Sequence, residues 1–199
     1  MNFGSHSKSH PNFVNFGKRN ATIFFKKLNS EVFESAEVLE KKLGIKDDDY
    51  AYPYGVFDPV IENVVRQRYS VIFTTNGGPD TIDTDPCRLN RYIIFKKNGL
   101  AKIEEYLNTE PLPVLETVPE NGGYLKKDKI LTFFFKNSEE VKKYKDYYID
   151  ISGYAYKVKI SDNTVYYNLS KLKYHILTMS LHAQDESGKK YIWTTIVNF

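Results

Sequence analysis

The sequence predicts an α+β fold: a single strand-rich domain with a mostly antiparallel sheet, about three short helices and an extended N-terminal arm. Three observations favour this class. Hydrophobic residues make up 41% of the 199 residues, which is enough to bury a core. Three segments combine helical spacing of apolar residues with capping residues. The last fifty residues alternate like strands and are broken by hairpin turns.

Residues 1–20 are predicted to form the arm, and residues 21–199 the domain. The arm is rich in Asn, Gly, Ser and His, and its apolar side chains are too few for a separate core. Ordering such a segment requires a partner that offers burial and hydrogen bonds. The arm's candidate groups for docking on a neighbouring subunit are Phe3, Phe13, Val14, Phe16, Lys18 and Arg19.

The first half of the domain is predicted to mix strands and helices. Residues 21–28 are typical of a strand, because β-branched and aromatic residues dominate them. A helix is then predicted from Ser30, as N-cap, to Gly44, as its C-terminal stop. Asp58-Pro59 indicates another helix start, with a strand as the alternative for the valine-rich residues that follow. Residues 69–75 are typical of a strand.

The middle of the chain contains one strand, one helix and a long connection. Residues 91–97 are predicted to form the strand, and Asn98 to cap a helix with Leu100 and Leu107 on one face. Residues 108–129 are rich in Pro and Gly, and loops of that length are usually functional or form interfaces.

The C-terminal part is predicted to be mainly β. A buried strand over residues 130–135 precedes a helix that Asn137 caps and that extends to Tyr148. Asp162-Asn163 indicates a hairpin turn. A second hairpin pairs residues 174–184 with 190–199, and the side chains expected on one face are Leu177, Met179, Leu181, Ala183, Tyr191, Trp193, Thr195 and Val197.

Charge is unevenly distributed along the chain. The net charge is +3, yet residues 1–30 carry five basic and no acidic side chains, and residues 31–62 sum to −6. This change of sign is typical of a basic arm followed by an acidic face, and two solvated surfaces explain it equally well.

No catalytic template is matched. The sequence lacks a Gly-rich phosphate loop, a Gly-x-Ser-x-Gly elbow and a His-Glu-x-x-His motif. The single cysteine, Cys87, excludes an internal disulfide and a Cys-rich zinc module, and we interpret it as an inert thiol. We therefore predict no catalytic residue, no cofactor, no metal and no enzymatic activity.

The histidines do not suggest a site by their spacing. His6 and His10 are four residues apart, but in a Gly/Ser-rich arm without helical character, so a mobile polar tail is favoured over a metal site. His175 and His182 are seven apart on one predicted strand and should face opposite sides.

Acidic residues form two clusters. In a bent loop, the carboxylates of Asp80, Asp83 and Asp85 can together surround a hard cation such as calcium or magnesium. Turn chemistry is favoured there, because Asp is common in loops that it caps itself. Residues 47–49 are interpreted as a solvated acidic loop or a charge partner for a basic arm.

Aromatic residues, at 15%, exceed the needs of a core and are typical of interfaces. The leading hypothesis is a non-enzymatic structural subunit of a large assembly, most concretely a tailed-phage virion protein of the capsid, neck or connector, or tail. Its partners would be copies of itself or other subunits. The arm and residues 108–129 would reach them, and further candidate interface residues are Tyr50, Tyr52 and Tyr54.

The alternative is a nucleic-acid-binding or nucleic-acid-processing protein that uses the basic, Tyr-rich C-terminal sheet. A metal-dependent enzyme built on the aspartates at positions 80, 83 and 85 ranks third. No apolar stretch approaches 18 residues and the N-terminus is polar. We therefore expect no membrane partner, no secretion through a signal peptide, and a location in the virion or in the host cytoplasm before assembly.

Overall fold

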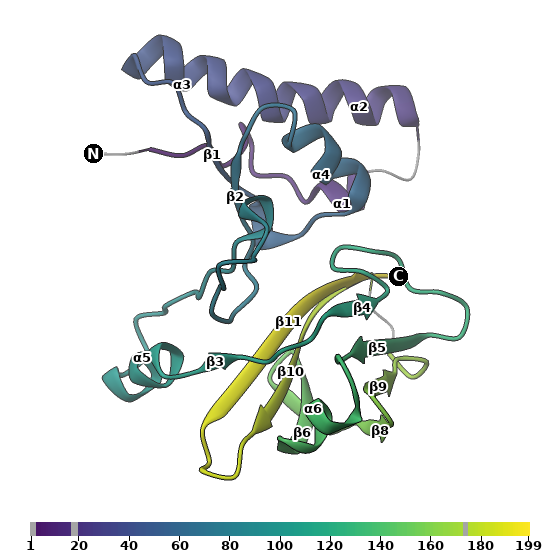
Figure 1. Cartoon of the computed structure of the whole chain (residues 1–199). Helices are drawn as coiled ribbons and strands as arrows, with labels where there is room; N and C mark the ends of the chain where they lie inside the picture. The colour runs from purple at the N-terminus through teal and green to yellow at the C-terminus, as the bar shows by residue number, and fades with distance from the viewer. Residues whose placement is uncertain (1–2, 17–19, 173–174) are drawn as a thin grey trace. The chain divides into compact units, whose positions relative to one another are not determined.

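The computed structural model describes residues 3–16, 20–172 and 175–199. It confirms the α+β class, because the chain contains both helices and antiparallel-rich sheets (Figure 1). The residues cluster into two compact units: unit 1 is Met1–Thr75 with Ile82–Arg91, and unit 2 is Asn76–Thr81 with Tyr92–Phe199. Among the described residues, no helix combines the length and apolar character that crossing a bilayer requires.

Unit 1 is mostly helical. Its small sheet is a parallel pair of strands in which Tyr50 lies opposite Ile72. The elements are α1 (Phe13–Phe16), α2 (Ala21–Asn29), the π-helical turn η1 (Ser30–Glu34), α3 (Ser35–Leu43), β1 (Asp49–Ala51), α4 (Pro59–Val65) and β2 (Val71–Phe73), with 3-10 turns at Pro53–Gly55 and Pro86–Arg88.

The strand expected over residues 21–28 is a helix instead. Asn20 caps it by accepting a 3.2 Å hydrogen bond from the backbone N–H of Ile23. Phe24 and Leu28, four residues apart, are buried on one face. This helical period outweighs the strand propensity of the individual residues. The helical segment runs on through Ser30, which is therefore not an N-cap, and ends as expected at Gly44.

The N-terminal residues pack within unit 1. Ser5 pairs in parallel with Tyr50, donating its N–H to the carbonyl of Asp49 at 2.9 Å. Phe13 and Val14 are buried in the unit's own core, so neither is exposed for a neighbouring subunit. Phe3 is about half exposed. Lys18, Arg19 and the side chain of Phe16 lie outside what the structure describes.

The tyrosines of residues 50–54 separate into two classes. Tyr50 and Tyr52 are fully buried and belong to the core, which corrects their assignment as interface residues. Their rings contact each other edge to face, with centroids 5.7 Å apart. Tyr54 alone is exposed, at 58%. Asp58 caps α4 as predicted, accepting from the N–H groups of Val60 and Ile61.

Unit 2 contains two sheets, of order β3-β11-β10-β6-β7 and β4-β5-β9-β8. The hairpin β10–β11 is the long yellow ribbon of Figure 1. The elements are α5 (Leu100–Leu107), β3 (Glu110–Pro111), β4 (Glu116–Val118), β5 (Ile130–Phe134), α6 (Ser138–Lys142), β6 (Lys145–Ile151), β7 (Tyr154–Lys157), β8 (Lys159–Ser161), β9 (Thr164–Asn168), β10 (Ile176–Gln184) and β11 (Lys190–Asn198).

One hydrophobic core joins the two sheets. Leu181 of β10 and Phe133 of β5 both belong to it and are fully buried. The predicted C-terminal hairpin is confirmed, with Leu181 opposite Trp193. Residues on β10 with even numbers, such as His182, consequently face away from this core.

Three expectations for unit 2 need correction. Residues 91–97 form no regular strand, and Ile93, Ile94 and Phe95 are about half exposed. The connection over residues 108–129 contains the short strands β3 and β4. The helix capped by Asn137 ends at Lys142, and residues 145–151 form β6 instead. This segment lies between β10 and β7 in the sheet, where the side chains of a strand point alternately to its two faces.

Candidate functional site

Unit 1 contains a polar arrangement in the segment of residues 5–10, here called the histidine loop. It begins where Ser5 joins β1, and the carbonyl of Ser5 accepts a 2.9 Å hydrogen bond from the N–H of Ala51. The Ser5 hydroxyl is buried and lies 2.7 Å from that of Ser35 on α3. These contacts attach the start of the loop to the body of the unit.

Glu31 fixes the middle of the loop. Its side chain is buried, and one carboxylate oxygen accepts hydrogen bonds from the backbone N–H groups of Lys8 at 2.9 Å and Ser9 at 2.7 Å. The Ser9 hydroxyl donates to the other oxygen. A buried carboxylate is expensive unless donors surround it, so this contact specifies one conformation of the loop. The π-helical turn presents Glu31 to the loop, and such turns are frequent at functional sites.

The backbone of the loop is strained. Ser7 and His10 have φ of 65° and 55°, in the left-handed region that L-residues seldom adopt. Their conformation is held by a 3.0 Å hydrogen bond from the N–H of His10 to the hydroxyl of Ser7. Tyr54, which contacts His10, also has a positive φ, of 58°. Residues of this kind cluster at ligand-binding and active sites.

The loop brings the rings of His6 and His10 together. Their centroids are 4.7 Å apart, and Tyr54 packs on His10 with centroids 4.6 Å apart. Nδ1 of His6 lies 2.7 Å from the carbonyl oxygen of Ala51. Because a carbonyl only accepts, Nδ1 donates in this contact, which leaves Nε2 as the ring nitrogen that a metal could approach. A backbone carbonyl on the second nitrogen is the usual way to orient a metal-binding histidine.

The pair offers two imidazole side chains as candidate ligands for a divalent transition metal, fewer than the three or four protein ligands of ordinary zinc sites. Both histidines are exposed and accessible, and imidazole nitrogens suit zinc and its neighbours in the first transition row. No group of three or more His, Cys, Asp or Glu side chains placed to hold a metal occurs among the described residues, so the pair supplies two ligands. The four-residue spacing of these histidines is the available sequence signal, but the lack of helical character in the segment argues against a metal site there.

Two other polar candidates from the sequence, Asp85 and Cys87, behave as structural groups. Partial burial acts to raise the pKa of Asp85, but hydrogen bonds from Arg66 and from the N–H of Cys87 hold it below its usual value. Asp85 thus caps the turn Pro86–Arg88. Burial raises the pKa of the Cys87 thiol, which opposes formation of a reactive thiolate.

Comparison with known proteins gives partial structural matches. No family model and no curated protein matches the chain. A polysaccharide deacetylase from Bacillus cereus matches 52% of this chain and 31% of its own, with 20% identity and a TM-score of 0.44. A Streptococcus pyogenes deacetylase, solved with acetate, matches 53% of this chain and 44% of its own, with 22% identity and a TM-score of 0.44. A de-N-acetylase from Aggregatibacter actinomycetemcomitans matches 45% and 36%, with 21% identity and a TM-score of 0.38.

The prediction that the chain is not an enzyme is corrected by these matches, because all three proteins are enzymes. The chain spans less than half the length of each of these proteins, and at such TM-scores the matches assign no reaction to it.

Proposed function

We propose that this chain contributes to a metal-dependent hydrolase, with a divalent ion held by His6 and His10. The observation that carries the proposal is the pair of exposed rings 4.7 Å apart, one of them oriented by a 2.7 Å contact to the Ala51 carbonyl. A divalent ion supplies Lewis acidity to hydrolytic reactions. Nε2 of His6 and a ring nitrogen of His10 would bind it.

The surrounding residues act by positioning. The Ala51 carbonyl keeps the proton of His6 on Nδ1, away from the binding nitrogen. Glu31 holds the backbone between the two histidines, so that their separation is set before a metal binds. Tyr54 restricts the ring of His10. Following the names of the partly similar enzymes, acetylated polysaccharide is the first substrate to assay.

Metal binding and activity test the proposal separately. Titration of the metal-free protein with Zn²⁺, followed by calorimetry, should show one site, and His6→Gln or His10→Gln should weaken it at least about tenfold. His175→Gln, an exposed histidine of unit 2, is the matched control and should leave the affinity unchanged. Acetate release should require Zn²⁺ and both loop histidines. Equal zinc affinity in all three variants would overturn the metal site, and zinc-independent release would overturn the mechanism.

The structural-subunit hypothesis and the nucleic-acid alternative stay predictions. Phe13 and Val14 are buried in unit 1, so they no longer support the hypothesis that the N-terminal arm docks on a neighbouring subunit. A test of nucleic-acid binding would target the basic side chains of the C-terminal sheet.

A further inference from the structure

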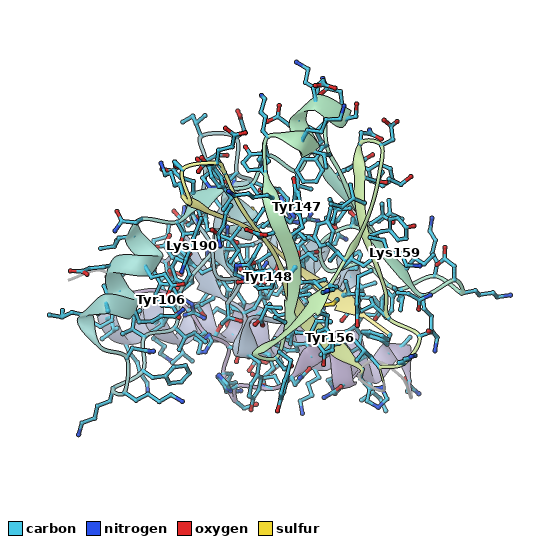
Figure 2. The ribbon with its side chains drawn as sticks, turned by 90° about the horizontal axis from the view of Figure 1, so that it is seen from below. Tyr106, Tyr147, Tyr148, Tyr156, Lys159 and Lys190 are labelled. Carbon is cyan, nitrogen blue, oxygen red and sulfur yellow. The ribbon has the colours of Figure 1, made fainter. Side chains whose placement is uncertain are left out.

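One edge of unit 2 is formed by a single stretch of chain that belongs to both of its sheets. β7 is the last strand of the five-stranded sheet, and β8 is the last strand of the four-stranded sheet. Val158 joins the two, and residues 154–161 are here called the β7–β8 edge. In the part of the chain that the structure describes, each strand pairs on one side only, β7 with β6 and β8 with β9. Figure 2 labels Tyr156 and Lys159 on the two halves of this edge.

Strand register places an uncharged stripe on the core side of the β7–β8 edge. Tyr154 lies opposite Ile151 of β6, and Ile160 lies opposite Val165 of β9. Ile151 and Val165 are core residues, and directly opposite residues share a face of the sheet. Alternation along the strand continues this face between the two ends. The core-side stripe consists of Tyr154, Tyr156, Val158 and Ile160.

The two ends of the core-side stripe are uncovered. Tyr154 is 69% exposed and Ile160 is 53% exposed, although both point to the core side. At the other end of each sheet the corresponding residues are buried. Thr117 of β4 lies opposite the core residue Phe133 and is 8% exposed, and Leu112, which follows β3, is fully buried. The β7–β8 edge therefore leaves apolar surface that one further strand would bury.

The β7–β8 edge also has little protection against pairing. Natural sheet edges are blocked by prolines, by very short strands or by charged side chains that point inward. Pro111 in the two-residue strand β3 and Pro113 beyond it protect the opposite edge in this way. Residues 154–161 contain no proline, and their charged residues, Lys157 and Lys159, alternate with the core-side stripe and so point outward. The open side thus presents backbone donors and acceptors to a partner strand.

We propose that the β7–β8 edge pairs antiparallel with the same edge of a second copy of this chain, about a twofold axis. The partner strand must be uncharged on its core side, and the edge itself has this pattern. A pairing centred on Tyr156 sets Tyr154 opposite Val158 and Ala155 opposite Lys157. The two core-side stripes then continue each other, and no lysine lies directly opposite a lysine. Because the other ends of both sheets are closed, the pairing stops at a dimer.

This surface lies in unit 2, so the proposal goes beyond the proposed hydrolase and does not need the histidine pair. Sedimentation velocity of the whole chain, from micromolar to millimolar concentration, tests it. EDTA in the buffer prevents metal ions from bridging exposed histidines of two chains. A strand edge is a small interface, so we expect a weak, reversible dimer with twice the chain mass of 23.2 kDa, whose fraction rises with concentration.

Two variants introduce a charge into the core-side stripe at its exposed ends. Tyr154→Lys and Ile160→Lys should each weaken dimerisation at least about tenfold, because a lysine would face the apolar stripe of the partner. Leu107→Lys is the matched control, because Leu107 is 80% exposed on α5 and lies outside the edge. This variant should form dimers as readily as the unchanged chain. Far-ultraviolet circular dichroism verifies that all three variants are folded.

Hydrogen exchange of the unchanged chain locates the interface without any substitution. Amides of β7 and β8 should exchange more slowly in the concentrated dimer than in the dilute monomer, whereas those of β4 should not change. Three results would overturn the proposal. They are a monomer at every concentration, a dimer that both stripe variants leave intact, and a chain that stays monomeric while an added peptide of alternating glutamate and valine protects β7 and β8.

Discussion

The carboxylate of Glu31 accepts a 2.7 Å hydrogen bond from the backbone N–H of Ser9, which joins the π-helical turn to the histidine loop. The loop itself has little regular structure, and two of its residues have strained backbones. Its conformation therefore depends on this contact and on the bond between His6 and the Ala51 carbonyl.

Replacement of Glu31 by Gln should loosen the histidine loop. The amide oxygen can keep both backbone N–H groups, but the negative charge that strengthens these hydrogen bonds is lost, and the Ser9 hydroxyl must turn to accept from the amide nitrogen. We expect the free energy of unfolding to fall by about 1–3 kcal/mol and zinc affinity to fall with it. Urea denaturation and zinc titration measure the two effects. Glu37→Gln, an exposed change on α3, is the control and should alter neither the free energy of unfolding nor the zinc affinity. Unchanged zinc affinity in Glu31→Gln would show that the histidine loop keeps its conformation without the Glu31 carboxylate.

Gly55 and Gly44 allow backbone strain to be separated from steric conflict. Their φ values are 69° and 67°, but a Cβ at Gly55 would lie 1.9 Å from Oγ1 of Thr75, whereas nothing lies within 4 Å of one at Gly44. Gly44→Ala should cost about 1 kcal/mol from conformation alone. Gly55→Ala should cost several kcal/mol more and displace Tyr54 from His10. Thermal denaturation compares the pair, and equal losses would contradict the steric argument.

Local signals in the sequence predicted the elements that local interactions determine. The caps at Asp58 and Asn137 and the C-terminal hairpin are confirmed, because each depends on residues close in the chain. Residues 145–151 were missed because their strand pairs with β10, thirty or so residues later, and the tyrosines fit a helix equally well. Long-range pairing overrode the local pattern.

The candidate site was visible in the sequence only as a spacing. His6 and His10 approach each other because Glu31 and Ala51, distant in sequence, fix the loop between and beside them. Nothing in the composition of a Gly/Ser-rich segment indicates such contacts. The stacking of Tyr148 on His182 was hidden for the same reason, since these two residues become neighbours only through strand register.

Trp193 tests the core of unit 2. It lies opposite Leu181 on the core-facing side of β11 and packs against the shared hydrophobic core. Trp193→Ala should reduce the free energy of unfolding by about 3–5 kcal/mol. Chemical denaturation followed by far-ultraviolet circular dichroism measures this loss. Ile160→Ala, on the exposed strand β8, is the comparison and should cost little, and a loss below about 0.5 kcal/mol for Trp193→Ala would place the indole outside the core.

His182 should make the stability of the chain depend on pH. Burial lowers its pKa in the folded state below the ordinary value of 6.5. Between the lowered pKa and 6.5, the unfolded chain therefore binds a proton that the folded chain does not, so stability rises with pH in this window. Acidification from pH 7 should weaken the fold, with a loss that begins near 6.5 and stops below the folded pKa. His182→Gln, which keeps a polar side chain, should flatten this part of the profile of unfolding free energy against pH. His175→Gln should leave it intact, because that side chain is exposed. An identical slope in the His182→Gln variant would show that another group binds the proton.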